Sequence, residues 1–124
     1  MKPITTEAHG ALDYLTAGLL YALPGLLGWD EKVAGRVKAA AVGTLLYSLV
    51  TKYERGFAPL AVLPMTAHLA LDGASGALFC AAPLLLPDEP KAVTNLLVGI
   101  GVFEILVTLN TQTVPQTEPT VGGR

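Results

Sequence analysis

The chain has 124 residues, of which 52% are hydrophobic and 15% are charged, and its formal net charge at pH 7 is −2. Because average proteins carry about 25% charged residues, this composition favours a membrane protein. The length fits one domain. The slightly negative net charge argues against a nucleic-acid-binding protein, which would carry a basic surface. The only cysteine, Cys80, excludes an internal disulfide and a paired-cysteine redox motif.

The first predicted helix begins at Thr5 or Thr6, since either side chain can cap it, and runs to about Leu23. Pro24 then kinks or ends the helix, because its nitrogen cannot donate to a carbonyl one turn back. Trp29 follows, a residue typical of the membrane–water boundary. The helix holds an acidic residue and lacks a convincing small-residue cleavage site, which argues against a signal peptide.

Three more helices follow in the predicted order, and small residues spaced four apart predict where helices pack closely. The later elements are helices over about 32–55, 64–83 and 92–110, an apolar loop over about 57–64, and a flexible polar tail over 111–124. The predicted packing faces are Gly35, Ala39 and Gly43 in the second helix and Ala70, Gly73 and Ala77 in the third.

One segment occurs twice, because residues 8–27 and 67–86 are identical at ten of twenty positions. The two copies predict two helix–turn–helix units in the same orientation, repeat 1 over about 7–56 and repeat 2 over about 64–112. With two residues removed from the connection, Tyr47 aligns with Glu104 and Thr51 with Thr108. The predicted fold is therefore all-α: a four-helix transmembrane bundle of two parallel-repeat hairpins in one domain over 1–110.

The repeat carries two copies of a His/Asp pair, His9 with Asp13 and His68 with Asp72. A spacing of four places each pair on one helix face. Ionisable groups in a membrane segment cost at least about 2.5–3.5 kcal/mol at the helix centre, so these four must face each other, a ligand or water. The up-down order of the helices predicts further polar neighbours for this cluster: Tyr47, Tyr53, Glu54 and Glu104.

Several interpretations of the cluster remain open. It can hold the two repeats together through hydrogen bonds. The protein is then a non-catalytic structural or accessory subunit in the lipid bilayer, either as a homodimer or within a larger complex. It can bind Zn, Mn or non-haem Fe through His9, Asp13, His68 and Asp72, because imidazole and carboxylate suit these metals. His9 and His68 can instead hold a haem, or the cluster can relay protons or bind a small ligand. No catalytic signature is present, so the first interpretation, without a cofactor, is preferred.

The motif His-x-Ala-Leu-Asp, followed by a Leu/Ala-rich helix with a late proline, occurs twice and resembles the SPW-repeat proteins, small integral membrane proteins of bacteria. The resemblance covers about residues 7–110. Where the family has Ser-Pro-Trp, this chain has Leu23-Pro24-Gly25 and Ala82-Pro83-Leu84, so the prolines agree. The resemblance implies four helices in a bacterial inner membrane and supplies no activity.

Overall fold

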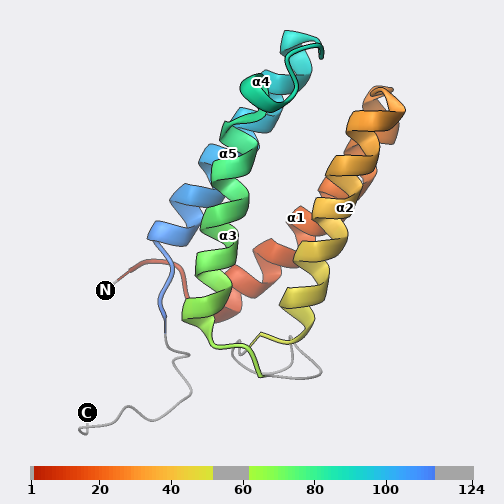
Figure 1. Cartoon of the computed structure of the whole chain (residues 1–124). Coiled ribbons are helices and arrows are strands. Elements are labelled where there is room, and N and C mark those ends of the chain that lie inside the picture. Colours follow the sequence, from red (N-terminus) through yellow and green to blue (C-terminus); the bar gives the residue numbers. More distant parts are fainter. Residues whose placement is uncertain (1, 52–61, 114–124) are drawn as a thin grey trace, which may run out of the picture. The chain divides into compact units, whose positions relative to one another are not determined.

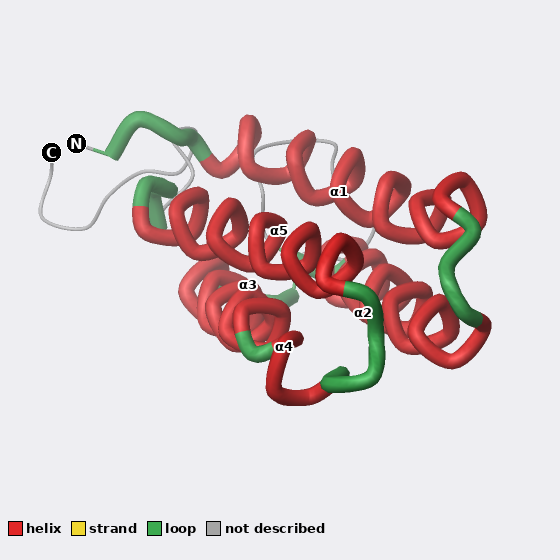
Figure 2. Tube along the Cα trace, turned by 90° about the horizontal axis from the view of Figure 1, so that it is seen from above, coloured by secondary structure: helices red, strands yellow, loops and turns green. Residues whose placement is uncertain are grey.

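The computed structural model describes residues 2–51 and 62–113. All named elements in these residues are helices, which confirms the predicted all-α class (Figures 1 and 2). They are α1 (Thr6–Leu27), α2 (Glu31–Leu49), α3 (Met65–Cys80), α4 (Ala82–Leu85) and α5 (Lys91–Leu109). They divide into two compact units, one made of residues up to His68 together with those from Asn110 onward, and the other of Leu69–Leu109.

In the first unit, α1 and α2 lie side by side as a hairpin (Figure 1). The Thr5 side chain caps α1 by accepting a hydrogen bond from the amide of Ala8, as the sequence predicted. The predicted end at Leu23 is wrong, because Pro24 lies inside the helix and removes only its own amide donor. The helix ends instead at Gly28, whose φ of 67° is a left-handed conformation that glycine adopts without steric cost.

The second helix, α2, ends at Leu49, whereas the sequence predicted a helix to about residue 55. The Thr51 hydroxyl donates to the carbonyl of Tyr47 at 2.6 Å. The Val50 carbonyl accepts from the amides of Val62 and Leu63 at 2.9 and 2.7 Å instead of from a following helical turn. The chain therefore leaves the helix where residues 62 and 63 form hydrogen bonds with the Val50 carbonyl. Positions 52–55 of the predicted helix lie outside the described residues.

In the second unit, α3 and α5 approach closely at two glycines. A Cβ added at Gly101 would lie 2.5 Å from the carbonyl oxygen of Gly76 and 2.8 Å from the amide of Cys80. The sequence placed this seam on the face of Ala70, Gly73 and Ala77, but a Cβ added at Gly73, three positions before Gly76, would meet nothing within 4 Å. The predicted third helix also stops earlier, at Cys80, and Pro83 lies in the first turn of the separate helix α4.

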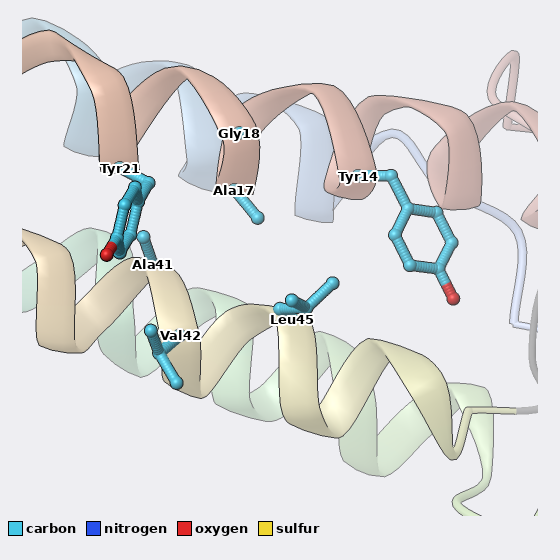
Figure 3. A pocket seen from close by; sticks show the side chains of 7 residues that line it. All are labelled: Tyr14, Ala17, Gly18, Tyr21, Ala41, Val42 and Leu45. Atoms are coloured by element: carbon cyan, nitrogen blue, oxygen red, sulfur yellow. The ribbon is translucent and has the colours of Figure 1, made fainter.

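The helices expose many large apolar side chains. Leu15, Leu19, Leu26 and Leu46 in the first unit are each more than half exposed. Figure 3 shows an apolar groove between α1 and α2, in which Tyr14 and Tyr21 reach toward the second helix. Its other lining residues are Ala17, Gly18, Ala41, Val42 and Leu45. Apolar surface of this extent marks contact sites for membranes, ligands or other proteins.

Two helices are long and apolar enough to cross a membrane, namely α1 over Thr6–Leu27 and α5 over Lys91–Leu109. The described part of the chain therefore contains two candidate spans, whereas the sequence predicted four. The second helix begins with several charged residues, Glu31, Lys32, Arg36 and Lys38, which lower its average hydropathy. Long basic side chains near a helix end can reach the membrane interface.

Candidate functional site

The first unit contains a buried cluster of two imidazoles and one carboxylate. His9 and Asp13 lie one turn apart on α1, and His68 lies in the first turn of α3. The Nε2 atom of His9 is 3.2 Å from Oδ1 of Asp13, and the Nε2 atom of His68 is 2.7 Å from Oδ2 of the same carboxylate. Both histidines are 0% exposed and Asp13 is 7% exposed. One carboxylate therefore joins two imidazoles in a site closed to bulk water.

The second nitrogen of each imidazole contacts a threonine hydroxyl. Nδ1 of His9 is 2.8 Å from Oγ1 of Thr111, and Nδ1 of His68 is 2.8 Å from Oγ1 of Thr51. Both threonines are fully buried. Each ring is consequently held at both nitrogens, with its Nε2 side turned toward Asp13.

The hydroxyl of Thr51 determines which nitrogen of His68 carries a proton. Because this hydroxyl donates to the Tyr47 carbonyl at 2.6 Å, its oxygen must accept from His68, so Nδ1 is the protonated nitrogen. In a neutral imidazole, Nε2 is then the unprotonated nitrogen, and it lies 2.7 Å from Oδ2 of Asp13.

Aromatic packing fixes the plane of the His68 ring. The Tyr47 ring lies edge-on to it, with centroids 4.8 Å apart and an angle of 74° between the planes. The His9 ring packs on it in the same manner, at 5.2 Å and 83°. These contacts favour one orientation of each imidazole, because edge-to-face pairs direct ring edges at ring faces.

Short backbone pairings bring the distant threonines to the histidines. Ile4 donates to the carbonyl of Asn110 at 3.0 Å and accepts from the amide of Gln112 at 2.8 Å, so Thr111 is placed opposite Ile4. Thr51 pairs with Leu63 in a second isolated bridge. The first bridge explains how Thr111 reaches His9, a residue 102 positions earlier in the chain.

Four of the eight polar residues that the sequence singled out gather here. His9, Asp13 and His68 make the cluster, and Tyr47 packs on it. Sequence reasoning missed the two threonines. Its alignment paired Thr51 with Thr108, whereas the structure gives the role matching Thr51 to Thr111.

Of the other four predicted site residues, two belong to the second unit and two lie outside the described residues. Asp72 follows His68 by one turn on α3 and is buried, but it belongs to the second unit, and its role as a metal ligand stays a prediction. Glu104 lies on α5 in the second unit, with its Cβ facing Gly76 on α3. Tyr53 and Glu54 lie outside the described residues.

The cluster has the donors for a metal ion, since the ligand atoms of His9, Asp13 and His68 lie within 4.8 Å of one another. A haem held between His9 and His68 fits the geometry less well. Both Nε2 atoms already contact the Asp13 carboxylate, which takes the space that a haem iron and its macrocycle would need.

The chain matches no known protein family, and no curated protein or solved structure is significantly similar to it.

Proposed function

We propose that this protein is a small integral membrane protein of the bacterial inner membrane that acts without catalysis, as a structural or accessory subunit. In this proposal a polar clasp holds the ends of several helices together, and it is made of His9, Asp13, His68, Thr51 and Thr111. The observation that carries the proposal is the pair of threonine contacts. Through them and Asp13, the clasp joins the start of α1 to the residues that follow α2 and α5 and to the start of α3.

The apolar exterior supports a membrane location. α1 and α5 are candidate spans, and many of their large side chains are exposed. The resemblance of the sequence to SPW-repeat proteins supports a bacterial inner membrane. Lipid provides no hydrophobic drive for helix association, so helices in a bilayer depend on close packing and on polar contacts. A clasp of this kind would supply the polar contacts.

The geometry of the clasp also supports the proposed internal repeat. His9 and His68 are 59 positions apart, as are Ile4 and Leu63. Thr51 and Thr111 are 60 positions apart. Each histidine bonds to a threonine near the end of the other proposed repeat, so the two copies of the His/Asp motif make matching contacts.

The membrane location predicts the result of an extraction experiment. The full-length protein, expressed in bacteria, should stay in the membrane pellet after a wash with alkaline carbonate and should dissolve on addition of a mild detergent, because its apolar surface needs a lipid-like environment. A peripheral membrane protein in the same sample serves as control, since carbonate should release it. Recovery of the protein in the carbonate supernatant would contradict the proposal.

The clasp predicts the stability of threonine variants. Thr51→Val and Thr111→Val keep the side-chain shape but remove the hydroxyl beside a buried imidazole, so each should lower the free energy of unfolding by about 1–3 kcal/mol. Thermal unfolding of the detergent-solubilised protein, followed by circular dichroism, measures the change.

A matched control is Thr6→Val. Thr6 is also fully buried on the same unit, but its hydroxyl makes no hydrogen bond within the described residues. Its replacement should therefore change stability little. If Thr51→Val and Thr111→Val unfold at the same temperature as Thr6→Val, the proposed clasp is wrong.

A further inference from the structure

We infer that His9, Asp13 and His68 form a binding site for a divalent first-row transition metal ion of the Zn²⁺ type, a function beyond the clasp. The inference rests on three features of the first unit, namely the direction of the imidazole nitrogens, the spacing of the donor atoms, and their burial.

The imidazoles are oriented as metal ligands are. Histidines that bind metals use one nitrogen for the ion and donate the N–H of the other to a neighbouring group, which fixes the ring. Here Nδ1 of His68 donates to Thr51, and Nδ1 of His9 lies 2.8 Å from the hydroxyl oxygen of Thr111. Both Nε2 atoms therefore present their metal-binding side to the same carboxylate.

The donor spacing fits one ion. A tetrahedral ion at about 2.0–2.1 Å from nitrogen and oxygen ligands places neighbouring ligand atoms about 3.3 Å apart. The Nε2 atom of His9 lies 3.2 Å from Oδ1 of Asp13, and that of His68 lies 2.7 Å from Oδ2 of the same side chain. All three ligand atoms fall within 4.8 Å of one another. An ion bound between His68 and Asp13 would widen their contact of 2.7 Å by about 0.6 Å.

The donor set selects the class of ion. Imidazole with carboxylate suits Zn²⁺, Fe²⁺, Co²⁺ and Mn²⁺, whereas Mg²⁺ and Ca²⁺ prefer oxygen ligands. Burial of all three side chains excludes most competing water, and the negative carboxylate offsets part of the charge of the ion. The threonine contacts remain in place when the ion binds, so the clasp and the metal site are compatible.

Metal titration of the full-length protein tests the inference. Because His9 and His68 are the only histidines, the protein must be purified through a tag without histidine and stripped with a chelator. Titration with Zn²⁺ should give one bound ion per chain. Titration with Co²⁺ should give visible absorption bands of a four- or five-coordinate ion, which Zn²⁺ then abolishes. Mg²⁺ at the same concentration should not compete.

Variants separate this site from adventitious binding. Thr51→Val, which removes a partner of a proposed ligand, should weaken binding of Zn²⁺ by about 10- to 100-fold. Loss of a proposed ligand should weaken binding more than that, as in His9→Ala and His68→Gln. Glu31→Gln, a change at an exposed carboxylate far from the cluster, should leave the affinity unchanged. Circular dichroism of each variant shows whether it is folded. If His9→Ala does not fold, the test of the site is made with His68→Gln.

The outcome also separates the metal site from the clasp. Absence of a stoichiometric ion in the wild-type protein, or an unchanged affinity in folded His68→Gln protein, would overturn the metal site. The clasp would still stand if Thr51→Val lowered the thermal stability of the metal-free protein. Conversely, stoichiometric binding with no effect of the threonine changes on metal-free stability would leave the metal site and remove the clasp.

Discussion

Replacement of Asp13 by alanine is expected to lower the free energy of unfolding by about 2–6 kcal/mol. The estimate follows from two buried imidazoles that lose the carboxylate they share, at about 1–3 kcal/mol for each buried polar group deprived of its partner. No nearby solvent can replace the carboxylate, because both histidines are fully buried. Asp13→Asn should cost less, since an amide still offers one acceptor and two donors to the rings.

Thermal and denaturant unfolding of the detergent-solubilised variants would measure this loss. Asp88→Ala is a suitable control, because Asp88 is exposed in the turn before α5 and its removal should change stability by less than about 0.5 kcal/mol. Equal stability of Asp13→Ala and Asp88→Ala would show that the cluster contributes nothing to the fold. Cooperative unfolding at one temperature must be verified first, since the described residues form two units.

Gly101→Ala is expected to cost about 1–3 kcal/mol, in the upper part of the range for an overpacked contact. Its Cβ would lie 2.5 Å from a backbone oxygen and 2.8 Å from a backbone nitrogen of α3. Those atoms belong to a regular helix and cannot move alone, so α3 and α5 would have to separate. Gly76→Ala should cost less, because its two shortest contacts, 2.9 Å to Cγ1 of Ile105 and 3.0 Å to the carbonyl oxygen of Gly101, are longer than those at Gly101.

The control for this change lies on the same helix. Gly99 is two residues earlier, and a Cβ there would meet no atom within 4 Å. Since alanine is favoured over glycine in a helix by about 1 kcal/mol, Gly99→Ala should leave stability unchanged or raise it. If the two alanine variants unfold alike, the close approach of α3 and α5 does not exist in solution.

The sequence predicted the parts of this protein that depend on local spacing. The His9–Asp13 contact follows from a separation of four residues on one helix, and the structure confirms it. The start of α1 follows from a threonine cap, which the structure also confirms. The helix over Lys91–Leu109 agrees with the predicted range to one residue at each end.

The parts that the sequence did not predict depend on contacts between distant segments. Thr111 becomes a partner of His9 only because the residues around it pair with Ile4, and no helical period relates these positions. The packing seam of α3 was predicted on the face of Gly73 because small residues occur on more than one face of this helix. Only the position of α5 decides that Gly76 is the glycine in contact. The four-helix transmembrane bundle and the SPW-repeat resemblance stay predictions.

The bridge between Ile4 and Thr111 has a consequence for the order of biosynthesis. A ribosome makes His9 and Asp13 about a hundred residues before it makes the hydroxyl that holds the first imidazole. In the proposed membrane location, the first helix would enter the bilayer before the final surroundings of its carboxylate exist. A nascent chain that stops before residue 110 would then lack the hydroxyl that holds His9, and its ionisable side chains would be costly in lipid.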